Sequence, residues 1–216
     1  MDKESREQLW NKVWDDAGYY TLKKKIEEIL ESETTSIFYP PLEILDRLNL
    51  RYKSVLDVGC GSGSFSIALK KAQKVSVAYL VDFSSSALYL AKRLREDFFG
   101  REKDELIQCD ARALPFRENS FCLAFSTGMI EHFDTKTQGT IIKECCRVAN
   151  DVICQVPTSS IPYWIMRFFI SIFNRGWPFG CEKPLNISEL RQLFAKENYV
   201  IRCVSGYVGH STHFIR

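Results

Sequence analysis

Two kinds of hydrophobic spacing alternate through the middle of the chain. Short, nearly continuous apolar runs have the length of β-strands, and the stretches between them repeat apolar residues every three or four positions, as on one face of a helix. The strand-like runs cover residues 54–59, 74–82, 105–110, 121–126 and 151–157. The helix-like stretches cover residues 64–71, 84–97 and 136–148. Apolar strands that alternate with helices predict an α/β fold with a parallel sheet covered on both faces.

The two ends of the chain have a different pattern. The first fifty residues are helical in spacing, and Trp10, Val13 and Trp14 share one helix face. After the fifth strand the chain is dense in aromatic residues, a capped helix is predicted over residues 186–199, and a terminal hairpin over residues 199–216. No linker divides the sequence, so we expect a single domain, 1–216, with an N-terminal helical arm, 1–50.

The composition of the chain narrows the range of functions and compartments to be considered. The chain has 216 residues, 45% of them apolar, and a net charge of +2, which gives no electrostatic reason to expect a nucleic-acid partner. Its eight cysteines lack metal spacing and mostly occupy apolar runs, so we expect reduced thiols in a cytoplasmic protein. The charged start, MDKESREQLW, is unlike a signal peptide, and no apolar run has the roughly 18 residues that span a bilayer.

A glycine-rich turn follows the first strand-like run. In VLDVGCGSGSF, Gly59, Gly61 and Gly63 occupy alternate positions between that strand and the next helix. Glycine permits backbone angles that other residues avoid and lets a ligand approach the main chain. The dinucleotide fingerprint needs its third glycine at the position of Ser64, whereas here it comes one residue earlier. The spacing alone leaves two types of nucleotide cofactor open.

Four sequence motifs, in the same order along the chain, resemble those of a known enzyme family. VLDVGCGSGSFSIAL, LVDFSSSAL, QCDARALPF and NSFCLAFSTGMIEHF resemble the four motifs of class I S-adenosylmethionine-dependent methyltransferases, and the small-molecule type is the most similar. The resemblance covers residues 53–157. It implies a Rossmann-like, doubly wound, mostly parallel sheet of seven strands with the last strand antiparallel, N-terminal helices and a helix inserted after strand five. It also implies that 53–157 is a cofactor-binding core.

The same resemblance implies a role for each motif. The three glycines would bring main chain, including that of Cys60, against the methionine part and ribose of S-adenosyl-L-methionine, and Asp57 would orient that loop. Asp82 would accept both ribose hydroxyls. Phe83, Asp110 and Ala111 would contact the adenine, and the backbone of Ser126 would hold the methionine amino group. Taken singly, Asp57 is also typical of a turn and Asp82 of a helix cap. Many relatives carry a Lys-Pro-Gly-Gly turn before strand five, and Asn150-Asp151 replaces it here.

Glu131 and His132 follow the fourth strand, at the expected mouth of the site. His132 is the best candidate for a general base, because the reference pKa of histidine lies near neutrality. The alternative is a histidine packed beside the next helix. Some relatives are expected to bind a metal through Glu-x-x-Glu-His, but Gly128 stands at the first position, so we predict no essential metal.

The aromatic stretch after strand five has three interpretations. Residues 160–185 form a predicted substrate lid, with Tyr163, Trp164 and Phe168 against an apolar acceptor, and Tyr19 and Tyr20 of the N-terminal arm closing the same pocket. The stretch is equally typical of a core helix. Membrane-surface contact through residues 163–173 is a weaker third possibility.

The predicted function is transfer of a methyl group from S-adenosyl-L-methionine to a small, partly apolar acceptor by in-line displacement. A protein or RNA methyltransferase is the alternative enzyme, although no basic groove is evident beyond LKKKIEE and ALKKAQK. A cofactor-binding scaffold for a partner enzyme is a non-catalytic alternative, and Ser64 and Asp57 disfavour a nicotinamide oxidoreductase. The acceptor and the oligomeric state stay open.

Overall fold

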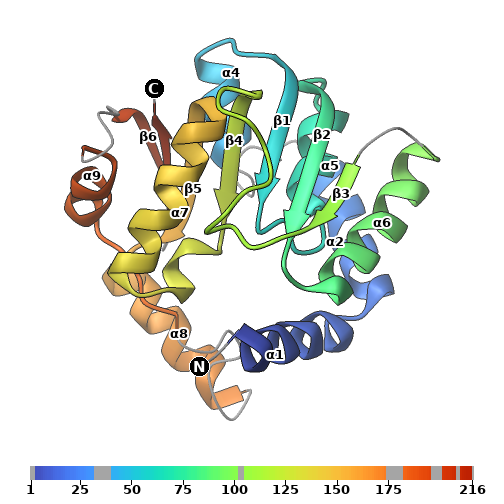
Figure 1. The fold of residues 1–216 in the computed structure, drawn as a ribbon. Helices are drawn as coiled ribbons and strands as arrows, with labels where there is room; N and C mark the ends of the chain where they lie inside the picture. The colour runs from blue at the N-terminus through green and yellow to red at the C-terminus, as the bar shows by residue number, and fades with distance from the viewer. Residues whose placement is uncertain are drawn as a thin grey trace.

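The computed structural model describes residues 3–31, 40–101, 105–173, 182–195, 201–207 and 210–215. Its centre is one sheet with the strand order β3-β2-β1-β4-β5-β7-β6 (Figure 1). The strands are β1 (Tyr52–Val58), β2 (Val75–Asp82), β3 (Glu105–Gln108), β4 (Phe121–Thr127), β5 (Ala149–Pro157), β6 (Ile201–Tyr207) and β7 (His210–Ile215). The α/β fold expected from the alternating pattern, and its Rossmann-like type implied by the resemblance, are therefore confirmed.

Five neighbouring strands run parallel and bring their carboxyl ends to one edge. Residue Val55 of β1 pairs with Ala78 of β2 on one side and with Leu123 of β4 on the other. These three residues are fully or almost fully buried, because helices cover both faces of the sheet. Strand β7 pairs antiparallel with both β5 and β6, as the expected terminal hairpin requires.

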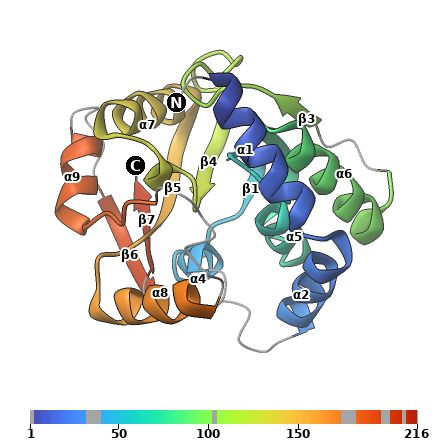
Figure 2. The same cartoon turned by 90° about the horizontal axis from the view of Figure 1, so that it is seen from below.

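Helices form a layer on each face of the sheet. One layer holds α2 (Tyr19–Glu31), α4 (Pro40–Arg47), α5 (Ser64–Lys71) and α6 (Ser85–Phe99), and the other holds α7 (Thr135–Val148) and α9 (Ile187–Ala195) (Figure 2). Side-chain caps fix where two of them begin. Ser84 accepts a hydrogen bond from the amide of Ala87, and Asp134 accepts one from the amide of Thr137. Because α6 and α7 follow β2 and β4, these caps also set where the loops at the carboxyl edge end.

Two further helices lie at the carboxyl edge itself. Helix α1 (Lys3–Asp16) and helix α8 (Ile161–Phe173) both lie below the strand ends in Figure 1, and the view onto that edge in Figure 2 separates them. The N-terminal helices and the helix after the fifth strand thus occur where the sequence predicts them. Within the described ranges, no helix is long and apolar enough to cross a membrane. The division into an arm, a core and a lid stays a prediction.

Candidate functional site

A cavity opens at the carboxyl edge of β1, β2, β3 and β4. Its lining joins the ends of these strands to one face of α1. The lining residues are Arg6, Trp10, Trp14, Gly59, Val81, Asp82, Phe83, Cys109, Asp110, Ala111, Arg112, Gly128, Met129, His132 and Phe133. Ligands of open α/β sheets bind at this edge, because the loops that leave the strands gather there.

The glycine turn has the backbone that its sequence predicts. Gly59, Gly61 and Gly63 have φ angles of 69°, 52° and 67°, a region that side chains with a Cβ rarely adopt. The three glycines nevertheless face different neighbours. A Cβ on Gly59 would overlap Met129, one on Gly61 would overlap the ring of Trp14, and one on Gly63 would lie 2.8 Å from Leu80 Cδ2. Gly63 therefore serves the packing of α5 on the sheet, which corrects the expectation that all three glycines face a ligand.

Asp82 ties the glycine turn to the end of β2. Its Oδ2 accepts a hydrogen bond of 2.9 Å from the amide of Gly61, and its Oδ1 accepts one of 2.9 Å from the amide of Ser84. The side chain is 8% exposed, and this burial raises the pKa of its carboxyl group. Asp82 also lines the cavity, and a carboxylate has about four lone-pair sites, so it has capacity left to accept a hydroxyl group from the cavity.

Asp57 lies beneath the turn and does not line the cavity. Its Oδ2 accepts a hydrogen bond of 2.6 Å from the hydroxyl of Ser66, the residue that follows Phe65 in α5. Its Oδ1 is buried and has no hydrogen-bond partner among the described residues. Burial raises the pKa of Asp57 to about 7. The geometry fits the expected role of orienting the turn from below.

The far end of the cavity is formed by the loops after β2 and β3. Phe83, Asp110 and Ala111 all line it, as predicted. Asp110 is held by Arg112, whose Nε donates to Oδ1 at 2.9 Å and whose Nη2 donates to Oδ2 at 2.5 Å. The carbonyl oxygen of Phe83 accepts a hydrogen bond from Gln108. Cys60 lies outside this lining, with its thiol buried and directed toward the carbonyl of Gly61.

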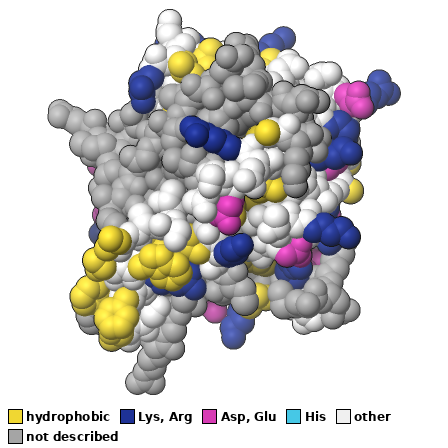
Figure 3. All heavy atoms as spheres, turned by 90° about the vertical axis from the view of Figure 1, so that its left-hand side faces the viewer, with side chains coloured by type: hydrophobic (Ala, Val, Ile, Leu, Met, Phe, Trp, Pro, Cys, Tyr) yellow, Lys and Arg dark blue, Asp and Glu magenta, His cyan; other side chains and the backbone are white. Residues whose placement is uncertain are grey.

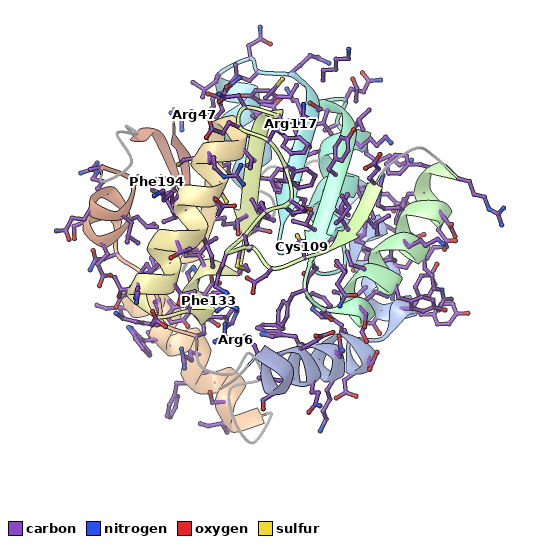
Figure 4. The ribbon with its side chains drawn as sticks, viewed as in Figure 1. Arg6, Arg47, Cys109, Arg117, Phe133 and Phe194 are labelled. Carbon is purple, nitrogen blue, oxygen red and sulfur yellow. The ribbon has the colours of Figure 1, made fainter. Side chains whose placement is uncertain are left out.

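Helix α1 covers the cavity with a face that the sequence reading did not assign to the site. Arg6, Trp10 and Trp14 recur every four residues, so they point to the same side of the helix. The guanidinium of Arg6 lies 4.9 Å from the ring centre of Phe133 (Figure 4). The ring of Trp10 lies edge-on to His132 at 4.8 Å. The apolar stripe of Trp10, Val13 and Trp14 was visible in the sequence, but nothing local shows what it packs against.

Polar side chains of α1 also hold the helix over the cavity. The hydroxyl of Ser84 donates to the side-chain oxygen of Asn11 at 2.6 Å, and the amide of Gln108 donates to Glu7 at 3.0 Å. These contacts reach the loops after β2 and β3. Together with the aromatic contacts, they fix α1 to the turns that line the cavity.

His132 and Glu131 are adjacent in sequence and point in different directions. His132 lines the cavity, and burial lowers its pKa, although the carboxylate of Glu182 and a hydrogen bond to the Gly128 backbone oppose that shift. The imidazole is therefore mainly neutral at neutral pH. Glu131 is 3% exposed, does not line the cavity and has an unpartnered Oε2 among the described residues. Its burial raises its pKa to about 8, which keeps it protonated.

Comparison with known proteins identifies the part of the chain that carries this cavity. A family model described as a methyltransferase domain matches residues 55–151. Residues 55–151 thus match a methyltransferase domain. A ribosomal protein L11 methyltransferase of Helicobacter acinonychis is 55% identical over 47 residues, which are 22% of this chain and 14% of that protein.

A second curated relative matches a longer stretch of the chain. The ubiquinone/menaquinone biosynthesis C-methyltransferase UbiE of Blochmanniella pennsylvanica is 35% identical over 86 residues, 39% of this chain and 34% of that protein. The chain thus spans about a third or less of the length of these two curated relatives.

Solved structures share the fold of this chain. The magnesium protoporphyrin IX methyltransferase ChlM of Synechocystis, with bound SAH, has a TM-score of 0.63 at 15% identity, over 89% of this chain and 82% of that one. The PH0226 protein of Pyrococcus horikoshii has a TM-score of 0.67 at 16% identity, over 87% and 93%. At these identities the likeness concerns the fold.

The residues that line the cavity near the end of β4 come later in the sequence than the expected residue, Ser126. Ser126 is 2% exposed, pairs with Cys154 of β5 and does not line the cavity. Gly128 and Met129 line it instead, where the strand has ended and the chain turns. The expected contact through Ser126 is therefore displaced by about two residues.

The two tyrosines predicted to close the pocket lie elsewhere on the protein. The hydroxyl of Tyr19 donates to Asp97 of α6, and Tyr20 is 81% exposed. Neither residue lines the cavity. The turn at Gly18 separates α2 from α1, so the arm closes the site with α1 and packs against α5 and α6 with α2. The prediction for Tyr19 and Tyr20 was wrong.

Helix α8 is neither a wall of the cavity, as a substrate lid would be, nor a fully buried core helix. Tyr163 is 1% exposed, and its hydroxyl donates to Glu182 at 2.8 Å, whereas Trp164 and Phe168 are 48% and 62% exposed. None of the three lines the cavity. The helix lies at the carboxyl edge, but its aromatic side faces solvent, so Trp164 and Phe168 belong to neither a pocket wall nor the core in this structure. Among the described side chains, no group of three residues could hold a metal ion.

Proposed function

We propose that the chain binds S-adenosyl-L-methionine in the cavity at the carboxyl edge and transfers its methyl group to a small, partly apolar acceptor. The observation that carries the proposal is the placement of Asp82. Its carboxylate ends β2, braces the glycine turn through Gly61 and still faces the cavity. An acidic residue at this position suits the two hydroxyl groups of a ribose.

The residues present fit the cofactor at three places. Gly59 exposes main chain to the cavity, Phe83 offers an aromatic face, and Asp110 with Ala111 offers polar groups for the edge of an adenine. Bound there, the cofactor supplies an activated methyl group on a sulfonium, so the protein has to position the acceptor in line rather than form a covalent bond. Met129 and His132, at the end of β4, lie on the side of the cavity left for an acceptor.

His132 is the residue that we assign to proton removal from the acceptor. Its neutral imidazole can accept a proton at neutral pH, and the hydrogen bond to the Gly128 backbone orients the ring. Glu131 faces away from the cavity, so we assign it no direct catalytic part. It helps to fix the turn that carries His132, because its carbonyl accepts the amide of Lys183 at 3.0 Å.

Because helix α1 covers the cavity, a small acceptor molecule would enter it more readily than a protein chain would. Helix α1 closes the opening with Trp10 and Trp14, and both rings exclude water from the reacting groups. The net charge of +2 also gives no broad field for RNA. The six cysteines whose side chains are described are free, which supports a reducing, cytoplasmic compartment.

Calorimetry with S-adenosylhomocysteine tests the proposal. Asp82→Ala should weaken binding by about 1.5–3 kcal/mol, because a charged acceptor of two hydroxyls is lost. Asp134→Ala removes a helix cap outside the cavity and should leave the affinity unchanged. Binding of NAD without binding of S-adenosylhomocysteine would refute the cofactor assignment.

The acceptor class needs a separate experiment. Cell extract incubated with the protein and labelled cofactor should yield label in the small-molecule fraction. Label confined to protein or RNA would favour the alternative enzyme class. No transfer by a protein that binds the cofactor would favour a scaffold for a partner enzyme.

A further inference from the structure

The outward face of α8 is the largest cluster of exposed apolar side chains among the described residues. Of the ten large hydrophobic side chains that are exposed in the described part of the chain, six lie on this one helix. They are Ile161, Trp164, Ile165, Phe168, Phe169 and Ile172, and they are between 48% and 78% exposed. Figure 3 shows hydrophobic side chains gathered at its lower left, where α8 lies. Apolar clusters of this kind mark interaction surfaces.

The spacing of these six residues forms one continuous stripe. They recur at intervals of three and four positions, so they share a single side of the helix over about 17 Å, at 1.5 Å per residue. The opposite side is fixed to the protein. Tyr163 is buried against Glu182, and Arg167 donates to the hydroxyl of Tyr163 at 2.9 Å and to the carbonyl of Glu182 at 3.1 Å. The helix is thus held with its apolar side outward.

The size of the stripe argues against a second copy of the chain as its partner. A stable protein interface takes about 20–30 residues from each side. Six residues on one short helix fall well below that number. They match instead the single apolar face that an amphipathic helix places in the boundary between headgroups and acyl chains.

The charge and composition of this segment match a membrane surface. Helix α8 itself contains one charged residue, Arg167, and no carboxylate, and the nearby Glu182 lies against Tyr163 and Arg167 on the side opposite the stripe. The stripe combines one Trp, a residue enriched at membrane–water interfaces, with Phe and Ile, apolar side chains that an interfacial helix can bury in the lipid. The guanidinium of Arg167 lies 5.5 Å from the ring centre of Trp164, so this cation borders the stripe while its hydrogen bonds hold it toward Glu182 on the other side of the helix.

We infer that α8 docks the protein on an anionic lipid surface, with Ile161, Trp164, Ile165, Phe168, Phe169 and Ile172 buried among the lipid chains. Helix α8 lies at the same edge of the sheet as the cavity (Figure 1). Docking therefore brings that edge to the membrane. The inference does not depend on the proposed methyl transfer.

Flotation with vesicles tests this assignment. The probes are vesicles of phosphatidylcholine with one quarter phosphatidylglycerol, and vesicles of phosphatidylcholine alone. The protein should float with the anionic vesicles and bind the neutral ones less. Phe168→Gln/Phe169→Gln should lower the partition coefficient at least about tenfold, because two apolar rings leave the bilayer. Both side chains are more than half exposed, so the variant should keep the far-ultraviolet spectrum and melting temperature of the parent.

A matched control removes two exposed aromatic rings elsewhere. Tyr20→Gln/Tyr89→Gln alters side chains that are 81% and 65% exposed on α2 and α6, and it should float like the parent. Brominated lipids should quench the fluorescence of the parent, and Trp164→Phe should remove most of that quenching. This second readout keeps the test decisive if the double variant folds poorly.

Three results would overturn the inference. The first is no flotation with anionic vesicles. The second is equal loss of binding in the control variant. The third is a dimer in sedimentation velocity that dissociates in Phe168→Gln/Phe169→Gln, which would make α8 a contact between copies of the chain.

Discussion

The contact between Trp14 and Gly61 allows a quantitative test of how α1 covers the cavity. A Cβ placed on Gly61 would overlap the Trp14 ring far inside van der Waals contact, and the φ angle of Gly61 is 52°. Gly61→Ala therefore has two costs. The left-handed backbone costs about 1–2 kcal/mol for a residue with a Cβ. Displacing the ring costs about a further 1.5–3 kcal/mol of lost burial.

A double-mutant cycle separates these costs. Trp14 is half-buried, so Trp14→Ala alone should cost about 2 kcal/mol, less than a fully buried Trp. Once the ring is gone, Gly61→Ala should add only the backbone cost. The double variant should then be about 1.5–3 kcal/mol more stable than the sum of the two single changes predicts, within the range seen for residues in contact. Urea unfolding of the four proteins measures this coupling.

The neighbouring glycine supplies a matched control. Gly63 also has a positive φ, but its Cβ would meet Leu80 and Ala91 rather than Trp14. Gly63→Ala and Trp14→Ala should therefore add to within about 0.5 kcal/mol. Additivity of Gly61→Ala with Trp14→Ala would show that the ring does not rest on the glycine turn, and would refute the described closure by α1.

Three further predictions concern single side chains. Burial raises the pKa of Glu131 to about 8 from an ordinary value of 4.5, so between these two pH values the unfolded chain binds fewer protons than the folded protein. The free energy of unfolding should therefore fall as the pH rises from about 4.5 to 8. Glu131→Gln should flatten the corresponding profile of melting temperature against pH. His132→Ala should lower turnover by about 10²- to 10⁴-fold with little change in cofactor affinity, and near-normal turnover at every pH would remove the base assignment. Asp134→Ala should lower the free energy of unfolding by about 1 kcal/mol through loss of the α7 cap, measured by urea unfolding.

The parts of the site that the sequence predicted are those fixed by local chemistry. The glycine turn, Asp82, Phe83, Asp110 and Ala111 all follow directly from the end of a strand. An apolar run that stops at a turn places these residues at the carboxyl edge without any knowledge of the rest of the chain. The alternation of strands and helices predicted the sheet for the same reason.

The parts that were missed depend on contacts between distant segments. Ser126 was expected to reach the cavity, but β4 extends to Thr127 and carries the opening of the site on to Gly128 and Met129. Tyr19 was expected beside the cavity, but its hydroxyl contacts Asp97, which is 78 residues away in sequence. No local sequence pattern predicts the residue at which a strand ends or the helix that a tyrosine side chain contacts.

Helices α1 and α8 show that an apolar stripe in the sequence does not by itself predict whether that side of the helix faces the protein or the solvent. Both have apolar residues at helical spacing, and by the usual rule both stripes should face the core. In α1 the stripe does so, because Glu7 and Asn11 on the same helix bond to Gln108 and Ser84 and turn Trp14 toward the cavity. In α8 the polar contacts of Tyr163 and Arg167 lie on the other side of the helix, and they turn the stripe toward solvent. The few polar side chains of each helix therefore decide whether its apolar face closes a cavity or stays exposed to a partner.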